Sequence, residues 1–523
     1  MPKVRQPKRL ETLALKKSSE WLCQLGERLI PQVEKAVHVD QKAAVDELNC
    51  VIEVAHDLFE RFIPFYLYKP LTDEVIKGIS RMIDRLKEGI EFKRHERMAK
   101  FIAQVNVALS LAQSLISVKL RIIDFDEMPK MVRSHFYPKL SKMRCLEWLS
   151  LGSVTGGWKT FDMEEALCDG LKNMNHLRHL CLNYDCTDSV LRTLVKNCPL
   201  LVSLDISNSK NINNKSVDLL VDLKNLRSVQ LYRTSVLMEG YINILLHLPE
   251  LQDIGRFDEL GRCLEYIADY YPSYGNFRLE SFVSVQATTK QIQVLCDKCP
   301  NLSSISLFHN VLLLDLMALI GLNQLSKLKL LSCDFFADQI RDVLEVKGCN
   351  LTTLSLEHVD EIDMNALIYI SQFCPELKTL VLCNCNLMES TSVRRFKLPP
   401  FMSLENLTVI GECSYKHLEF LLCNAHRLKF LHLGTQIITS DELFEKVFLR
   451  NELSQLEEMR ILHSDYLTVK TAYALVNNCF NLQKLFEIES WLAVTPTEFE
   501  ELKRYVKLKN FDVDLTSYRK FVT

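Results

Sequence analysis

Glycine is scarce in this sequence, and long hydrophobic runs are missing. Only 15 of the 523 residues are glycine, and no G-x-x-x-x-G-K-[ST] phosphate-binding loop occurs. The longest apolar run, 311–322, is interrupted by Asp315 and is too short to cross a bilayer. The chain opens on basic and polar residues instead of the apolar core of a secretory signal. These absences argue against a nucleotide-dependent protein and against a membrane protein, and we expect a cytoplasmic or nuclear location.

A strong charge of one sign and known catalytic motifs are lacking as well. The formal net charge is −3, whereas a dedicated nucleic-acid-binding protein is usually clearly basic. Neither G-x-S-x-G nor H-E-x-x-H occurs. Cys296 and Cys299 form a C-x-x-C pair, but a second pair at the spacing of a zinc site is absent. We therefore expect a protein that is not an enzyme, takes no cofactor or metal, and binds neither nucleic acid nor membrane.

One phrase, L-x-x-L-x-L, recurs along most of the chain. It reads Leu-Thr-Thr-Leu-Ser-Leu from Leu351 and Leu-Lys-Thr-Leu-Val-Leu from Leu377. When other apolar residues are allowed in place of leucine, about fifteen units open between residues 146 and 508, roughly 26 residues apart. A unit of this length cannot bury its own apolar face, so its leucines form a core only when neighbouring units stack.

Each unit combines a strand pattern with a helix pattern. In one of them, alternation turns Leu180 and Leu182 toward the interior of a short strand. A helix follows, for which Thr187 or Asp188 is the N-cap and Pro199 the stop signal. One strand and one helix per unit predict an α/β fold: a horseshoe-shaped solenoid of about fifteen repeats, with parallel strands inside and helices outside.

The chain contains 18 cysteines, and several occupy fixed places in the repeat. Cys333 and Cys385 stand at the ninth position, where other units have small polar residues. Interior thiols spread along a ladder predict free cysteines in a reducing compartment rather than disulfides. Four further cysteines stand three residues before the residue that opens a unit: Cys198, Cys299, Cys374 and Cys479.

These residues resemble the cysteine-containing class of leucine-rich repeats, and the resemblance covers about residues 145–523. It is clearest between Leu351 and Leu377, where the phrase ends on Phe-Cys-Pro-Glu-Leu. The resemblance implies the leucine-rich-repeat fold. It also implies an intracellular protein, since this class is common in F-box-containing substrate receptors of ubiquitin ligases.

The repeat phrase is absent from the first 123 residues, where helical periodicity replaces it. We expect a disordered tail over 1–9, a helical module over 10–123, a junction over 124–144 and the repeat domain over 145–523. Helices are predicted over 10–29, 43–62, 72–87 and 95–119, the third with a capped start at Thr72. Within the repeats, 311–322 is interpreted as a helix, a long loop is expected around Trp158, and an aromatic loop within 251–279.

The helical module resembles two kinds of adaptor-binding box. Ile63 and Pro64, followed by apolar residues at helical spacing, are loosely similar to the start of an F-box. The elongin-binding box of Zyg/Zer-type receptors is similar at Leu13 and at Trp21, with Lys17 where that box has cysteine. Either resemblance implies a cullin-RING adaptor as partner, of the SCF or the elongin type, bound by Leu13, Trp21 and Pro64. The alternative is that the helices only cap the solenoid.

The inner face predicted by the strand register mixes aromatic and polar side chains, which is typical of a protein-recognition surface. Tyr270 and Tyr271, in the aromatic loop, are further candidates for contact with a partner. The candidates on the inner face are Trp148, His179, Tyr232, Phe257, Phe308, Lys327, Lys329, Phe430 and His432.

Two functions remain open on this sequence. The first is a non-catalytic substrate receptor of a cullin-RING ubiquitin ligase that binds its protein target on the inner face. The second is a protein-interaction scaffold with no role in ubiquitin transfer, whose N-terminal helices act as a cap.

Overall fold

The computed structural model describes residues 4, 9–37, 40–88, 95–125, 130–153, 156, 163–309, 315–332, 335–388, 393 and 395–515. These residues form two compact units. The N-terminal unit is Lys8–Gly255, and the C-terminal unit is Arg256–Thr523 together with Met1–Pro7. The predicted disordered tail lies largely outside the described residues, although Val4 forms an antiparallel bridge with Phe511.

The N-terminal unit begins with the predicted helical module. Apolar residues at helical spacing, such as Leu15, Leu22 and Leu29 of the first helix, are buried between the helices. Asp40 caps the second helix by accepting hydrogen bonds from the amides of residues 42 and 43. The elements are α1 (Leu10–Val37), α2 (Gln41–Phe62), η1 (Phe65–Leu67), α3 (Tyr68–Glu88), α4 (His95–Ser110) and η2 (Leu111–Leu115).

Three predicted helix boundaries in the module were wrong. The first helix, predicted to end at residue 29, continues to Val37. The third helix starts at Tyr68 instead of Thr72, whose hydroxyl donates to the Tyr68 carbonyl at 2.8 Å inside the helix instead of capping its start. The fourth helix ends at Ser110, and the 3-10 helix η2 follows where the sequence predicted a continuous helix to residue 119.

A five-stranded parallel sheet follows, with its strands in chain order. Leu149, Leu180 and Leu204 point into the core as predicted, and Thr187 is the N-cap of its helix. The first strand ends at Asp124, in a part of the chain where no repeat strand was expected, so the sheet starts one strand earlier than the repeat phrase. The elements are β1 (Ile122–Asp124), α5 (Val132–Phe136), η3 (Tyr137–Lys142), β2 (Trp148–Ser150), α6 (Glu164–Leu171), β3 (His179–Cys181), α7 (Asp188–Asn197), β4 (Ser203–Asp205), α8 (Asn214–Leu220), β5 (Ser228–Gln230) and α9 (Met238–His247).

The C-terminal unit contains a nine-stranded parallel sheet, again in chain order, and a two-stranded pair. Its main strands are β6 (Ser281–Val285), β7 (Ser304–Phe308), β8 (Lys327–Leu331), β10 (Thr353–Glu357), β12 (Thr379–Cys383), β13 (Asn406–Ile410), β14 (Phe430–Leu433), β15 (Glu458–Ile461) and β16 (Lys484–Phe486), and the pair is β9 (Phe335–Phe336) and β11 (Val359–Asp360). Its helices are α10 (Leu260–Tyr270), α11 (Thr289–Lys298), η5 (Leu316–Gly321), α12 (Ala337–Lys347), η6 (Gly348–Asn350), α13 (Met364–Phe373), α14 (Tyr415–Asn424), α15 (Asp441–Arg450), α16 (Val469–Asn478), η7 (Ile488–Ser490) and α17 (Pro496–Leu508).

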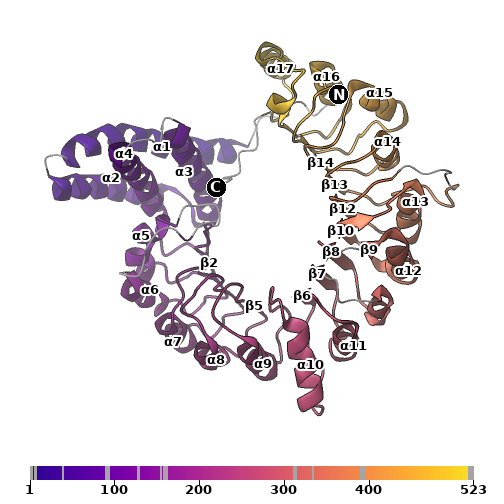
Figure 1. Cartoon of the computed structure of the whole chain (residues 1–523). Coiled ribbons are helices and arrows are strands. Elements are labelled where there is room, and N and C mark those ends of the chain that lie inside the picture. The colour runs from indigo at the N-terminus through magenta and orange to yellow at the C-terminus, as the bar shows by residue number, and fades with distance from the viewer. Residues whose placement is uncertain are drawn as a thin grey trace. The chain divides into compact units, whose positions relative to one another are not determined.

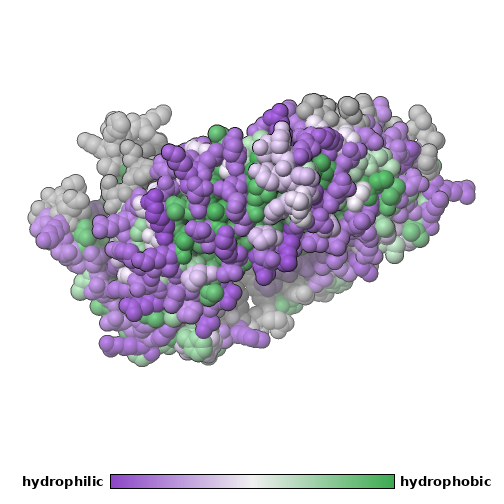
Figure 2. All heavy atoms as spheres, turned by 90° about the horizontal axis from the view of Figure 1, so that it is seen from below, coloured by the Kyte–Doolittle hydropathy of each residue, from purple (hydrophilic) through white to green (hydrophobic). Residues whose placement is uncertain are grey.

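Within each unit the strands lie side by side on one side and the helices of the repeats on the other (Figure 1). The predicted fold class is confirmed: an all-helical module precedes a leucine-rich-repeat solenoid of strand–helix repeats with parallel sheets. On the face shown in Figure 2, hydrophilic residues form most of the surface, and hydrophobic residues gather in patches among them.

Three predicted irregularities have different outcomes. The stretch 251–279 was expected to hold an aromatic loop. Tyr266 and Tyr270 lie on the regular helix α10, whereas Tyr271 and Tyr274 follow it in a segment without helix or strand. The apolar run 311–322 was expected to be a repeat helix, and its described part forms the short 3-10 helix η5. The loop predicted around Trp158 lies outside the described residues.

The cysteine ladder is buried as its spacing predicted. Every cysteine that the structure describes is a free thiol. Burial raises the pKa of Cys198, Cys299, Cys374 and Cys479 to about 12, because the apolar core disfavours the thiolate. These thiols therefore act as small apolar core residues.

In many of the repeats the chain turns after the strand through a residue in the left-handed region. The eighth position of nine repeats has a positive φ, and only one of these residues, Gly411, is glycine. The other eight are Tyr184, Asn208, Arg233, Gln286, His309, Ser332, His358 and Asn384. Sequence reasoning missed this feature because the side chains at this position share no chemistry, although each non-glycine residue costs about 1 kcal/mol there.

Replacing Gln286 by glycine is therefore expected to stabilise the protein by up to about 1 kcal/mol. Gln286 has a φ of 53° and is exposed, so the main effect is relief of backbone strain. Gln483→Gly is the control, since Gln483 is exposed without a positive φ and its replacement should cost roughly 0.5–1 kcal/mol. Thermal unfolding of the two variants checks this, and a lower melting temperature for Gln286→Gly would contradict it.

Candidate functional site

The face of the N-terminal sheet that points away from the core is the one predicted as the inner face. It carries one exposed aromatic stack. Trp148 and His179 are paired residues of the neighbouring strands β2 and β3, so their side chains point the same way. Their rings stack at a centroid distance of 4.3 Å and an interplanar angle of 30°. Trp148 is 40% exposed, and partial burial lowers the pKa of His179, with Arg178 adding to the effect. This stack is an apolar platform on an otherwise polar face.

The rest of this face is built from short polar side chains. Ser203 and Ser228 continue the row of Trp148 and His179 on β4 and β5. Beyond β5, the carboxylate of Asp253 accepts hydrogen bonds from Gln230 at 2.8 Å and from the amide of Gly255 at 3.0 Å. Such bonds hold the polar side chains of Gln230 and Asp253 in place.

Tyr232 lies at the end of β5, half-buried, and the Arg233 guanidinium sits 5.2 Å from its ring centroid. A cation over an aromatic face is favourable and keeps the ring in one orientation. The structure thus places Tyr232 on the same unit as Trp148 and His179, and all three are at least partly accessible, as the register predicted.

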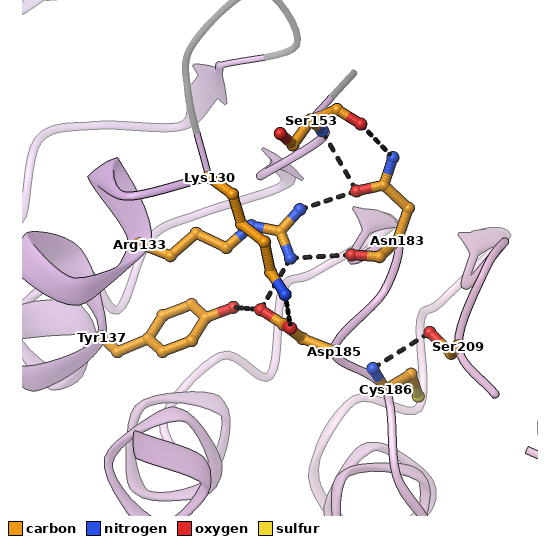
Figure 3. Close-up of polar contacts among 8 residues, drawn as sticks. All are labelled: Lys130, Arg133, Tyr137, Ser153, Asn183, Asp185, Cys186 and Ser209. Atoms are coloured by element: carbon orange, nitrogen blue, oxygen red, sulfur yellow. Dashed lines mark hydrogen bonds and ion pairs between the residues drawn. The ribbon is translucent and has the colours of Figure 1, made fainter. Parts of the chain in front are cut away.

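A buried ion cluster joins the junction helices to the ends of the strands (Figure 3). The Asp185 carboxylate lies 2.5 Å from the Lys130 ammonium and 2.7 Å from the Arg133 guanidinium, and it accepts the Tyr137 hydroxyl at 3.0 Å. Arg133 is 0% and Asp185 10% exposed. Burial drives the pKa of Tyr137 far above its usual value of 10, so its hydroxyl stays a donor.

The same guanidinium also binds the loop that follows β3. Arg133 donates to the Asn183 carbonyl at 2.7 Å and to its side-chain oxygen at 2.6 Å. Asn183 in turn exchanges two hydrogen bonds with the backbone of Ser153 (Figure 3). The side chain and carbonyl of Asn183 are therefore engaged within the protein. The cluster positions the edge of the face that carries Trp148 and His179.

In the C-terminal unit, the strand face combines aromatic and charged residues. Phe308 is half-buried, and the Arg256 guanidinium lies 4.6 Å from its ring centroid. Lys327 is exposed and Lys329 half-buried, both on β8. Phe257 is half-buried in the turn before α10, where its carbonyl accepts the amide of Leu260 at 3.1 Å. Phe308 is the last residue of β7 and pairs with Leu331 of β8. Phe257 lies outside the strands.

A second group of candidates lies near the end of the same sheet. Phe430 is exposed on β14, and His432 is half-buried two residues further on. Burial lowers the pKa of His432, and its paired neighbour Arg460 lowers it further. Arg460 forms an ion pair with Glu487 at 3.1 Å. His432 is therefore neutral near pH 7 and offers hydrogen bonds without adding charge.

Tyr270 and Tyr271 are both exposed, at the end of α10. Tyr270 stacks on Tyr266, one helical turn earlier, at a centroid distance of 4.4 Å. Both rings of this stack are exposed. The stack remains a candidate contact, although it belongs to a helix rather than to the predicted loop.

Several apolar side chains of the helical module lie at its surface instead of in its core. Leu13 and Trp21 are exposed on α1, and the Trp21 ring contacts Phe59 of α2 edge-on at 6.2 Å. Pro64 is exposed at the N-terminal end of η1. Three neighbours of Pro64 that sequence reasoning missed are also exposed: Phe62, Phe65 and Tyr66. The run of aromatic residues around a proline was the signal that could have identified them.

Among the described residues, no group of three or more His, Cys, Asp or Glu side chains could hold a metal ion. None of the described helices is long and apolar enough to span a membrane.

Comparison with known proteins gives structural likenesses only. No protein-family model matches the sequence, and no curated protein matches it. A chain of the yeast Rad7–Elc1 complex is 16% identical over 79% of this chain and 91% of its own, with a TM-score of 0.38. An internalin of Listeria monocytogenes is 15% identical over 67% and 83%, with a TM-score of 0.30. A leucine-rich-repeat protein of Leptospira interrogans is 13% identical over 79% and 91%, with a TM-score of 0.29. Likenesses of this degree carry no conclusion about the function or partners of this chain.

Proposed function

We propose that this protein is a non-catalytic substrate receptor of a cullin-RING ubiquitin ligase. Its helical module binds the adaptor of the ligase, and the outward faces of its strands bind the protein target. It acts without a cofactor, in the cytoplasm or the nucleus.

The exposure of apolar side chains on the helical module is the observation that carries this proposal. Helices that served only as a cap would need one apolar face, and α1 already buries Leu15 and Leu22. Leu13 and Trp21 remain at the surface, 43% and 42% exposed, with Phe62 and Phe65 exposed in the same module. A contiguous patch of exposed apolar residues marks a protein-binding surface, and these four residues are the candidates for such a patch.

The strand faces fit a protein target better than a small molecule. The stack of Trp148 and His179 provides an aromatic anchor, and polar side chains surround it on neighbouring strands. Binding sites between proteins commonly combine a few aromatic anchors with a polar surround. Tyr232, half-buried, is a further candidate in the N-terminal unit. Candidates in the C-terminal unit are Phe257, Tyr270, Tyr271, Phe308, Lys327, Lys329, Phe430 and His432.

A scaffold without a ubiquitin role is the second candidate function. The contact between α3 and β1 favours it, because the module covers the first strand of the sheet as a cap would. The cap and the adaptor surface would use different faces of the module, so the capping contact by itself does not exclude the first function.

Affinity purification of the full chain tests the ligase role. The wild-type protein is expected to retain a cullin and its adaptor, and Leu13→Glu combined with Trp21→Ala to lose both. Point variants are preferable to deleting residues 1–123, because the deletion would remove most of β1. Val45→Glu, another exposed apolar residue of the module, is the control and should retain both proteins. A wild-type preparation that lacks cullin and adaptor refutes the proposal.

A further inference from the structure

A cavity of about 770 Å³ lies in the C-terminal unit, at the carboxyl ends of β12, β13 and β14. Ligand-binding pockets of proteins are commonly of this size. It is separate from the strand-face candidates, since its walls come from the loops that follow three successive strands. The residues that matter for its chemistry are Asn384, Asn386, Leu387, Glu412, Gln436 and Ile438.

A shift of one residue in the repeat register creates the polar wall of this cavity. In the repeat that opens at Leu377, the ninth residue, Cys385, is buried. In the next two repeats the tenth residue is buried instead, Cys413 in one and Ile437 in the other. Glu412 and Gln436, at the ninth position, are therefore left at the surface and line the cavity.

Four polar side chains of the wall are not used for hydrogen bonding within the described part of the protein. In the part of the chain that the structure describes, the side chains of Asn384, Asn386, Glu412 and Gln436 make no hydrogen bond. Ser414, which also lines the cavity, is committed differently: its hydroxyl caps α14 and bonds the His417 ring. Unengaged amides and a carboxylate that converge on one cavity are suited to an external partner.

Backbone packing keeps this wall rigid. Gly411 has a φ of 102°, and a Cβ at this position would lie 3.0 Å from the Cα of Asn384. The loops after β12 and β13 therefore approach closely at Gly411, where any other residue would be strained. The backbones of these two loops, from which Asn384 and Glu412 project, are fixed relative to each other before any ligand arrives.

The chemistry of the wall indicates a peptide with a basic side chain. Each carboxamide offers a donor and an acceptor, which matches the N–H and C=O groups of an extended backbone. Glu412 is the charged residue of the lining and favours a cation. Leu387 and Ile438 provide aliphatic contact for the stem of a lysine or arginine. The described lining contains no aromatic ring on which a sugar could stack.

We propose that this cavity binds an extended peptide segment of a partner protein, with a lysine or arginine directed at Glu412. The inference rests on the protein-recognition half of the proposed function and is independent of the adaptor. Loss of peptide binding and loss of adaptor binding are therefore separate outcomes, measured in different assays.

The test uses the full chain and an array of 12-residue peptides of varied sequence, each with Lys, Arg, Gln or Glu fixed at the centre. The wild-type protein should retain the Lys and Arg peptides about tenfold better than the Gln and Glu peptides. Glu412→Gln should remove this preference, whereas Glu376→Gln, at an exposed glutamate outside the cavity, should keep it.

A gain-of-function variant guards against misfolding as an explanation. Gln436→Glu adds a second carboxylate to the wall and should strengthen retention of the Lys and Arg peptides severalfold. Equal retention of all four peptide sets by the wild type overturns the proposal. So does a Glu412→Gln variant with unchanged preference, or a Gln436→Glu variant with no gain.

Discussion

The Asp185→Asn variant is expected to lose about 3–5 kcal/mol of unfolding free energy, a large fraction of the stability of an ordinary domain. Asp185 is the carboxylate that neutralises Lys130 and Arg133 in the buried cluster. Its amide replacement keeps the shape but leaves two buried cations without a counter-charge. Urea denaturation measures the loss, and the melting temperature should fall with it.

A surface pair of the same unit provides the control. Asp169 lies 2.6 Å from the Lys172 ammonium, and more than half of each side chain is exposed. Asp169→Asn should therefore cost less than about 1 kcal/mol, because solvent screens an exposed pair. If the two variants lose similar amounts, the cluster in Figure 3 does not hold the junction to the repeats.

A cooperative effect is expected when the whole cluster is replaced. Changing Lys130 and Arg133 to Met and Asp185 to Leu together removes the charges without leaving one unpaired. The triple variant should lose less stability than the sum of its single changes, because buried ions are costly mainly when one partner is missing.

The second large effect is acid destabilisation through His135. This imidazole lies between α5 and α4, within 3.2 Å of the Ser110 hydroxyl and 3.3 Å of the Gln113 amide nitrogen. Burial, and to a smaller degree Lys139, lowers its pKa from 6.5 to about 4. The unfolded chain therefore takes up a proton near pH 6.5, whereas the folded protein does so only near pH 4.

Stability must consequently fall as the pH drops from about 6.5 toward 4. At pH 5 the loss attributable to this group is roughly 2 kcal/mol relative to neutral pH. His135→Gln should flatten the curve of stability against pH in this range, and His247→Gln, at an exposed histidine of α9, should leave it unchanged. A His135→Gln variant with the wild-type pH dependence would contradict the account.

The repeat fold could be predicted from local periodicity, because each repeat packs only against its neighbouring repeats. Leu180 is buried by alternation along its strand, and Thr187 caps the helix that follows, so both are visible in a short window of sequence. Cys198 could be assigned to the core from its fixed distance to the next strand.

Features that depend on distant partners could not be predicted in this way. Asp185 occupies the ninth position, where a small polar residue was expected to bond its own loop, but its partners Lys130 and Arg133 lie about 50 residues earlier and outside the repeats. The strand β1 lacks the full phrase and was recognised only by its pairing with β2. The cavity beside Glu412 depends on a one-residue shift in the repeat register, which buries Cys413 instead of residue 412. This shift does not change the repeat length enough to be detected in the sequence.

The candidate sites were predicted in part. The aromatic stack of Trp148 and His179 follows from strand register, since paired positions of neighbouring parallel strands project together. Phe257 was assigned to the inner face by counting along its repeat. This repeat has no regular strand at Phe257, which lies in the turn before α10, so counting could not locate the residue. Pro64 was recognised, but the aromatic residues around it were treated as a break between helices.

Two exposed tryptophans provide the most direct test of a receptor with separate surfaces for adaptor and target. Trp21 and Trp148 are 42% and 40% exposed, so each alanine variant is the matched control of the other. Quantitative mass spectrometry of the proteins that co-purify with Trp21→Ala and with Trp148→Ala compares the two surfaces in one experiment. The account predicts that Trp21→Ala loses the cullin and adaptor but keeps the targets, whereas Trp148→Ala keeps the cullin and adaptor and loses targets by tenfold or more. If both variants retain the same proteins as the wild type, or both lose the same set, the two-surface account is contradicted.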